Sequence, residues 1–571
     1  MSQTVADIII EVLAEAGAQR CYGVPGDTLN YVTDAIRRNG MRFVHVRHEE
    51  AGGFAAAADA MLTGELALCA GSCGPGSLHF INGLYDAHRS RCPVVLIASQ
   101  IVRSEIGFDF PQEVDFRSVY AASSVFCEEI RTPENARRLT MAAAQAALTK
   151  RGVAVLIVPA DVSQAKAPPQ PPFRVHRTTP VTRPGDDELA RIAEALNRPG
   201  KVAIYGGSGC QGAHDQVVAL AGRLKAPVAY TSRAKDFLEY DNPFAVGMTG
   251  VFGVESGYRA LMECDTLLLL GCDFAWRQFY PDGATIVQID IDGTHLGRRH
   301  PIDLGAVGDI AATIDALLPR IEPRDDDRFL KEIRRTRDEA YAKLDRRAVA
   351  SDHSIHPQYL AQLIAKHAEQ DAVFTADGGS PMVWLLRHVP ANGRNRTVLS
   401  LTHGTMANAM PNALGAAAAF PGRQVISLSG DGGIAMMFGD LMTAVQERLP
   451  IKIVVFNNSS LAFVEIEQKV EGLLDAFTDL KNPDFGRVAE AMGLWGRRVE
   501  HAKDLEAAVV EWLAAPGAAL LDVVTDRFEL VIPPHIEPTQ VYGTALYSTK
   551  AMLGGHMKDV VNLIGHNFLE K

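Results

Sequence analysis

The length of 571 residues predicts three or four domains of roughly 150 residues each. Apolar residues make up 47% of the chain and charged residues 22%, which is typical of a globular protein with sizeable cores. The net charge of −12 argues against a nucleic-acid-binding surface, because phosphate backbones attract an excess of Lys and Arg. The eight cysteines include no C-x-x-C pair and no nearby histidine partners, which argues against a zinc framework and favours reduced thiols.

The first segment has the apolar spacing of a helix, carried by Val5, Ile8, Ile9, Val12, Leu13 and Ala16. Asp7, Glu11 and Glu15 lie inside this pattern, which a signal peptide would not tolerate. No stretch of about 18 uninterrupted apolar residues occurs, so no membrane-spanning helix is expected. We therefore expect an intracellular, cytoplasmic protein.

Short apolar runs alternate with longer amphipathic or alanine-rich segments, which indicates α/β structure with parallel sheets. Residues 164–188 contain six prolines and no apolar periodicity, which predicts an extended linker. Residues 323–354 are dominated by charge and predict a solvated helix that leads out of a domain. We expect three doubly wound parallel-sheet domains and a C-terminal tail, at residues 1–165, 185–325, 352–530 and 531–571.

A glutamate follows a short strand that is predicted at residues 43–46. Glu49 comes directly before an alanine-rich segment, so it lies at a strand-to-helix junction among small residues. A partly dry junction of this kind raises the pKa of a carboxyl group. The alternative is an ordinary helix-start glutamate that the helix dipole favours.

A glycine-rich turn follows the strand predicted at residues 201–205. Gly207, Gly209 and Gly212 satisfy G-x-G-x-x-G between that strand and a predicted helix, as nucleotide-binding turns do. A NAD site would also need an acidic residue at the end of the second strand, about 20 residues on. The segment that closes that strand ends at Arg233, so NAD is disfavoured, and the motif alone is a weak signal.

Two buried strands are predicted at residues 423–430 and 451–456, with a helical segment between them. The crossover of such a βαβ unit makes the two strands parallel. Asp431 follows the first strand and Asn458 the second, so both should emerge at the carboxyl edge of the sheet, where open α/β sheets bind ligands. A carboxylate and an amide oxygen suit Mg²⁺ that also binds phosphate oxygens, and the glycines beside Asp431 let backbone N–H groups approach a diphosphate.

Each half of this pattern has an ordinary alternative, G-D-G as a tight turn and N-N as a strand-ending turn. The combination, with 24 residues between G-D-G and N-N, resembles the thiamine-diphosphate signature of the pyruvate oxidase and acetohydroxyacid synthase family. The resemblance implies thiamine diphosphate and Mg²⁺ as cofactors, with Asp431, Asn458 and the backbone oxygen of Ser460 as metal ligands. It also implies cofactor contacts from the flanking residues Gly432, Gly433, Ser459, Leu461, Ala462, Phe463 and Val464.

The stretch R-H-E-E-x-x-x-x-A-A-A-A-D-A at residues 47–60 resembles the N-terminal motif of the same family. By that resemblance, Glu49 donates to the aminopyrimidine nitrogen and so promotes deprotonation of the thiazolium carbon, with Glu50 as the alternative if the register is shifted by one. In this family the glutamate comes from one subunit and the metal site from the other. A homodimer, or a dimer of dimers, is therefore expected.

Two further segments resemble cofactor-facing loops of the family. In residues 403–411, Met406 matches the side chain that keeps the cofactor bent, with Gly404 and Thr405 beside it; the alternative for an isolated methionine is core filling. In residues 71–79, His79 matches a polar group near the reacting centre; the alternative is a structural histidine.

The central region resembles the FAD domain of the quinone-linked pyruvate oxidoreductases of bacteria, in residues 207–214, 239–250, 267–281 and 286–292. The resemblance implies FAD as a third cofactor, with Asp290 accepting a ribose hydroxyl. The other residues implied to contact the flavin nucleotide are Gly207, Gly209, Arg233, Thr249, Gly250, Val251, Phe252, Cys272, Asp273, Phe274, Ala275 and Trp276. The alternative is a related domain that has lost its nucleotide.

The substrate pocket departs from the family at two positions. The loop with Gln112, implied to be catalytic, carries Pro111 where the family usually has an aromatic residue. Phe463 matches a residue expected between thiamine and flavin, and Glu467 a pocket carboxylate, but Glu465 is an additional acid. Both changes are expected to touch the acceptor side of the pocket and so to bear on the choice of substrate.

The resemblance implies oxidative decarboxylation of pyruvate, or of a close 2-keto acid, to acetate and CO₂, with electrons passed through FAD to quinone. The alternative is a carboligase or decarboxylase without redox chemistry, like the acetohydroxyacid synthases, in which FAD is only structural.

By the resemblance to the quinone-linked oxidoreductases, which reach the membrane through a similar terminal segment, the tail is expected to contact the inner face of the cell membrane. Met557, Val560, Val561, Ile564 and Phe568 form one apolar helical face, although a helix packed on its own protein explains the same spacing. We expect substrate-dependent peripheral binding, with the tail released when the flavin is reduced. Liposome sedimentation of reduced enzyme should fall on removal of residues 549–571, and identical sedimentation of both proteins would contradict this expectation.

Overall fold

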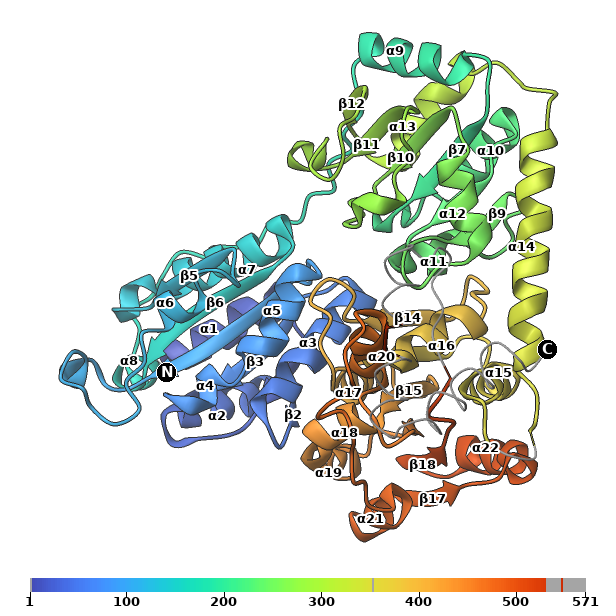
Figure 1. Cartoon of the computed structure of the whole chain (residues 1–571). Coiled ribbons are helices and arrows are strands. Elements are labelled where there is room, and N and C mark those ends of the chain that lie inside the picture. Colours follow the sequence, from blue (N-terminus) through green and yellow to red (C-terminus); the bar gives the residue numbers. More distant parts are fainter. Residues whose placement is uncertain (1–2, 352–353, 530–545, 548–571) are drawn as a thin grey trace.

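The computed structural model describes residues 3–351, 354–529 and 546–547 (Figure 1). It contains three six-stranded sheets, and every strand pairing in them is parallel. The predicted class, α/β with three parallel-sheet domains, is therefore confirmed. None of the described helices combines the length and the apolar character needed to cross a membrane.

The first sheet has the strand order β2-β1-β3-β4-β6-β5. Its strands are β1 (Arg20–Gly23), β2 (Arg42–His45), β3 (Ala67–Gly71), β4 (Val94–Gln100), β5 (Phe126–Glu129) and β6 (Val153–Pro159). Its helices are α1 (Val5–Glu15), α2 (Asn30–Asn39), α3 (Glu49–Thr63), α4 (Pro75–Leu78), α5 (Ile81–Arg89), α6 (Phe116–Tyr120), α7 (Ala136–Lys150) and α8 (Ala160–Gln164). A capping box between Thr4 and Asp7 fixes the start of α1, so Asp7 has a structural role at the N-terminus of this helix.

The middle sheet has the order β12-β11-β10-β7-β8-β9, which is the doubly wound nucleotide-binding order. Its strands are β7 (Val202–Gly206), β8 (Val228–Tyr230), β9 (Ala245–Met248), β10 (Thr266–Leu270), β11 (Thr285–Asp290) and β12 (Leu304–Val307). Its helices are α9 (Asp186–Asn197), α10 (His214–Leu224), α11 (Lys235–Leu238), α12 (Glu255–Met262) and α13 (Ile310–Leu317), and the long α14 (Arg328–Arg347) leads to the third sheet (Figure 1). The strand order reverses between β7 and β10, where such sheets bind ligands.

The third sheet, β14-β13-β15-β16-β18-β17, repeats the topology of the first. Its strands are β13 (Val373–Ala376), β14 (Arg396–Leu399), β15 (Val425–Gly430), β16 (Ile451–Asn457), β17 (Trp495–Val499) and β18 (Ala519–Val524). Its helices are α15 (Pro357–His367), α16 (Ser380–His388), α17 (Ala409–Ala419), α18 (Asp431–Met436), α19 (Leu441–Gln446), α20 (Ala462–Val470), α21 (Phe485–Ala491) and α22 (Leu505–Ala514).

Apolar cores continue from the third sheet into both other sheets. One core contains side chains of the first and third sheets, and another contains side chains of the middle and third sheets. Where the first and third domains meet, α3 packs against α17 so closely that a Cβ on Gly415 would lie 2.0 Å from the Ala55 carbonyl oxygen. The alanine-rich sequence of α3 thus permits a close helix contact. This contact fixes the position of α3, which begins at Glu49.

Candidate functional site

The loops that follow β15 and β16 meet at one edge of the third sheet. The two strands pair up to Gly430 and Phe456, and Asp431 comes next in the chain. The Asp431 carboxylate is buried and accepts hydrogen bonds from the backbone N–H of Gly432 at 2.9 Å and of Ser459 at 2.6 Å. Burial raises the pKa of Asp431, which these donors counteract. The structure thus brings together the two loops singled out in the sequence.

The Asn458 loop has a tightly turned backbone. Ser459 adopts a left-handed conformation with φ of 56°, and the Ser460 N–H donates to Asn458 Oδ1 at 3.0 Å. The side-chain amide of Asn482 donates to both Asp431, at 2.8 Å, and Asn457, at 3.0 Å. Asp431, Asn458 and Ser460 therefore line one pocket, and a carboxylate, an amide oxygen and a backbone oxygen are the donors that Mg²⁺ prefers when it keeps phosphate oxygens.

The two glycines that follow Asp431 lie so close to other residues that a side chain at either position would clash. A Cβ on Gly433 would lie 2.2 Å from Asp377 Oδ2, and one on Gly432 would lie 2.8 Å from Leu461 Cδ2. Asp377 follows β13 and accepts from the backbone N–H of Gly430 at 3.1 Å and of Ala409 at 2.9 Å. Complete burial raises the pKa of Asp377 to about 7.

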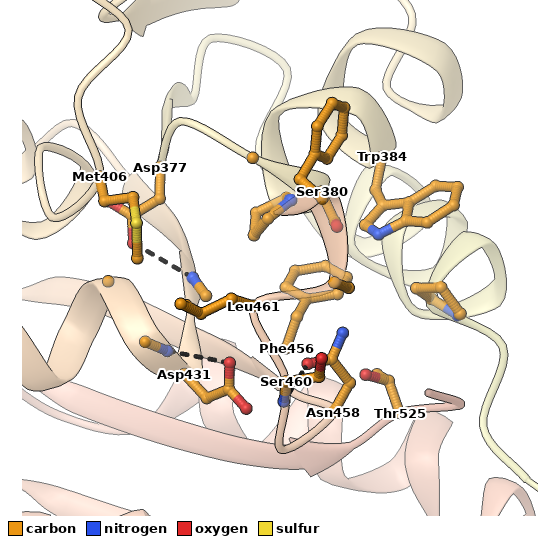
Figure 2. Close-up of a pocket in the computed structure, with 18 of the residues that line it drawn as sticks. Asp377, Ser380, Trp384, Met406, Asp431, Phe456, Asn458, Ser460, Leu461 and Thr525 are labelled. Atoms are coloured by element: carbon orange, nitrogen blue, oxygen red, sulfur yellow. Dashed lines mark hydrogen bonds between the residues drawn. The ribbon is translucent and has the colours of Figure 1, made fainter. Parts of the chain in front are cut away.

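A pocket opens between these loops (Figure 2). Two helices, α16 and α18, begin at its wall with Ser380 and Asp431, so their positive ends face the pocket and favour a bound anion. The described residues that line it are Pro357, Asp377, Gly378, Gly379, Ser380, Pro381, Trp384, Met406, Gly430, Asp431, Gly432, Gly433, Phe456, Asn458, Ser460, Leu461, Ala462, Phe463, Val464, Thr525, Asp526 and Glu529. This cradle and donor set fit a magnesium-bound diphosphate.

Met406 points into this pocket beside Leu461 (Figure 2). The loop before it is held by Ser400, whose Oγ accepts from the backbone N–H of Gly404 at 3.1 Å and of Thr405 at 3.2 Å. The same hydroxyl donates to the buried carboxylate of Asp86, on α5 of the first domain, at 2.8 Å. The position of Met406 therefore depends on the contact between the first and third domains.

Glu49 lies at the first residue of α3 and is 9% exposed. Its Oε2 lies 2.9 Å from Nδ1 of His79, and the His79 ring stacks on His48 at 4.8 Å. Glu50 instead accepts a hydrogen bond from Asn82 at 2.6 Å. Among the described residues, no side chain of the first domain lines the pocket of the same chain, so Glu49 and the pocket are separate within one chain.

The predicted substrate-side residues occupy two regions. Gln112 is exposed and has φ of 68°. Its Oε1 accepts a hydrogen bond from Cys73 Sγ at 3.1 Å, so Gln112 lies against the segment that ends at His79. Phe463 lines the pocket, whereas Glu467 is exposed further along α20 and does not line it.

The additional acid, Glu465, was expected to touch the acceptor side of the pocket, but it is not among the described residues that line the pocket of its own chain. It is 5% exposed and paired with Lys469, Ser460 and Arg527. Burial acts to raise the pKa of Glu465, but hydrogen bonds from Lys469 and Ser460 outweigh it, and the net shift is downward. A helix turn of α20 directs the side chain inward, behind the loop that carries Ser460.

The predicted flavin segments meet in the middle domain. A Cβ on Gly250 would lie 2.7 Å from Phe274 Cζ, and one on Gly207 would lie 2.6 Å from Cys272 Cα. Gly209 packs equally closely on Gly271, and α10 begins at His214, beyond the glycine-rich turn. The remaining predicted residues, Val251, Asp273, Ala275 and Trp276, belong to the same two segments.

Two of the predicted flavin residues carry polar atoms that the described residues leave without a partner. They are Nε of Arg233 and Oγ1 of Thr249, both buried. Since buried polar groups are nearly always hydrogen-bonded, such atoms fit a site for a polar ligand. Asp290, at the end of β11, accepts from the Asp292 N–H at 3.0 Å through one oxygen. The donor set is compatible with a nucleotide, although Arg233 also donates to Ser90 of the first domain at 2.9 Å.

Models of one enzyme family match segments of all three domains. The N-terminal TPP binding domain, the central domain and the C-terminal TPP binding domain of thiamine pyrophosphate enzymes match residues 3–119, 189–317 and 377–523. A Bacillus subtilis protein described only as thiamine pyrophosphate-containing is 33% identical over 96% of each chain.

The chain belongs to the thiamine pyrophosphate enzyme family.

Two relatives of this thiamine pyrophosphate enzyme carry the names of different reactions. Pyruvate oxidase of Lactiplantibacillus plantarum is 29% identical over 87% of this chain and 84% of its own. The large subunit of acetolactate synthase isozyme 2 of Escherichia coli is 28% identical over 92% of this chain and 96% of its own. The similarity thus covers both the oxidase and the synthase types.

Sequence reasoning missed Asp377 and Asn482 in this thiamine pyrophosphate enzyme. Asp377 had a signal, because it follows a buried strand and precedes two glycines, as Asp431 does. Asn482 had none, since it lies in a segment without helix or strand and reaches Asp431 only through the folded loop.

Proposed function

We propose that the pocket of the third domain binds thiamine diphosphate through Mg²⁺. Asp431, Asn458 and the backbone oxygen of Ser460 would bind the metal, and the start of α16 would bind the diphosphate. Met406 would support the bent cofactor. The convergence of Asp431 with the Asn458 loop, at 2.6 Å between Oδ2 and the Ser459 N–H, supports the metal assignment.

Glu49 would act at the thiamine of a second subunit. The separation of Glu49 from the pocket of its own chain supports a shared site, because the catalytic carboxylate and the metal loops must meet for activity. His79, 2.9 Å from Glu49, would orient the carboxyl group and shuttle its proton. A homodimer, or a dimer of dimers, follows from this arrangement.

The proposed reaction is oxidative decarboxylation of pyruvate, or of a close 2-keto acid. Bound thiamine diphosphate supplies a nucleophilic carbon and an electron sink for loss of CO₂. Overall, pyruvate and water yield acetate, CO₂, two protons and an electron pair, which FAD would accept and quinone would take up. The residues that would hold FAD are the two segments around Gly250 and Phe274, with Arg233, Thr249 and Asp290.

One observation carries the redox assignment. Phe463 lines the thiamine pocket, and its ring lies edge-on to Phe252 of the middle domain, with centroids 6.2 Å apart. The pocket and the middle domain are therefore in direct aromatic contact, which supports electron passage between cofactors bound in them. The similarity to an acetolactate synthase supports the alternative, a carboligase with structural FAD, no better than the similarity to a pyruvate oxidase supports the redox reaction.

The experiment mixes enzyme with pyruvate under anaerobic conditions and follows the visible absorbance of the flavin. Bleaching is expected, followed by recovery of the colour when a soluble quinone is added. Formation of acetolactate with unbleached flavin would favour the carboligase. Enzyme that contains no flavin after purification in FAD would contradict the cofactor assignment.

A further inference from the structure

The buried carboxylate of Glu465 lies directly behind the loop that would bind the metal. Glu465 is in the first turn of α20, and its Oε2 accepts a hydrogen bond from the hydroxyl of Ser460. Both residues are at most 5% exposed. Glu465 was singled out in the sequence as an additional acid, and no step of the proposed reaction uses it.

Two cationic side chains contact this carboxylate in addition to the Ser460 hydroxyl. Lys469, one helical turn on and 6% exposed, pairs with Oε1, while Arg527 donates to Oε2 at 3.2 Å. Arg527 also pairs with Asp479, which forms a backbone bridge with Ser460. A buried ion pair is costly to form unless its groups are fully hydrogen-bonded, and here each oxygen of Glu465 has a partner.

Ser460 is consequently fixed at three points. Its N–H donates to Asn458, its hydroxyl donates to Glu465, and its backbone bridges to Asp479. The left-handed Ser459 in the same turn has a conformation that L-residues rarely adopt, so the loop needs outside contacts to keep its shape.

We propose that Glu465 is a positioning residue, which holds the Ser460 turn in the geometry that binds Mg²⁺ and thereby the diphosphate. This inference rests on the proposed thiamine diphosphate site. Residues that orient metal ligands typically contribute 10–100-fold to metal affinity. A purely structural ion pair would stabilise α20 without changing the affinity for the metal.

The test measures the Mg²⁺ concentration that half-saturates thiamine diphosphate binding, without substrate, by quenching of tryptophan fluorescence; Trp384 lines the pocket. Glu465→Ala is expected to raise this concentration by roughly 10–100-fold. Glu465→Gln keeps an acceptor for the Ser460 hydroxyl and is expected to change it less. Ser460→Ala, which leaves the backbone oxygen in place, is expected to raise it several-fold, and the double variant should be no worse than Glu465→Ala.

A matched control is Glu239→Ala, which breaks the pair between the buried Lys235 and the half-buried Glu239, also one helical turn apart. It is expected to lower the melting temperature and to leave the half-saturating Mg²⁺ unchanged. An unchanged value in Glu465→Ala and Ser460→Ala, or an equal rise in Glu239→Ala, would overturn the inference. If Glu465→Ala does not fold, Ser460→Ala decides alone. Wild-type protein that binds no thiamine diphosphate with Mg²⁺ would instead contradict the proposed function.

Discussion

Replacing Glu49 by Gln is expected to lower turnover of the 2-keto acid by roughly 10²–10⁴-fold, the usual contribution of a positioned acid or base. Glutamine has the shape of glutamate and can preserve the contact with His79, whose Nδ1 lies 2.9 Å from Oε2 of Glu49. It cannot exchange the proton that activates thiamine. The fold and the cofactor affinity should remain. Steady-state kcat, together with the half-saturating concentration of thiamine diphosphate, checks both parts.

Glu50→Gln is the matched control for this variant. Glu50 is adjacent in α3 but contacts Asn82, so its replacement is expected to leave most of the turnover in place. The assignment fails if Glu49→Gln turns over at the wild-type rate. It shifts by one residue if Glu50→Gln, and not Glu49→Gln, abolishes turnover.

Replacing Asp431 by Asn is expected to weaken Mg²⁺-dependent binding of thiamine diphosphate by roughly 100-fold, at the upper end of what metal-site residues contribute. Asparagine can still accept from the Ser459 N–H, but it lacks the charge that the cation requires. The second oxygen of Asp431 accepts from the Gly432 N–H, which an asparagine NH₂ group cannot do, so the melting temperature of the variant should fall slightly. Titration calorimetry and thermal unfolding measure the two effects.

A mixing experiment tests whether the two residues serve one shared site. When subunits with Glu49→Gln and subunits with Asp431→Asn are mixed, each mixed dimer has one site in which both residues are wild type. Random mixing should restore about a quarter of the sites, because half of the dimers are mixed and each has one intact site. If both residues came from the same chain, mixing would restore no activity.

Local patterns predicted most of the secondary structure near the sites. The strand predicted at residues 451–456 is β16, Ile451–Asn457, and the one predicted at 423–430 is β15, Val425–Gly430. Both are central strands of a parallel sheet, so they are apolar on both faces, and continuous apolar runs mark them. The glycine-rich turn was less informative, since α10 begins only at His214 and a short 3₁₀ turn precedes it.

The sequence by itself determined the fold class, the two loops at the ends of β15 and β16, and the glutamate that begins α3. These features depend on strand polarity and on residues adjacent in the chain, so short segments of the sequence are enough to predict them. Only the tertiary structure revealed that Asp377 and Asn482 support Asp431, and that Glu465 faces inward to Ser460. Those contacts join segments whose packing no local pattern encodes, because a side chain's partner is decided by how helices and loops pack on the sheet.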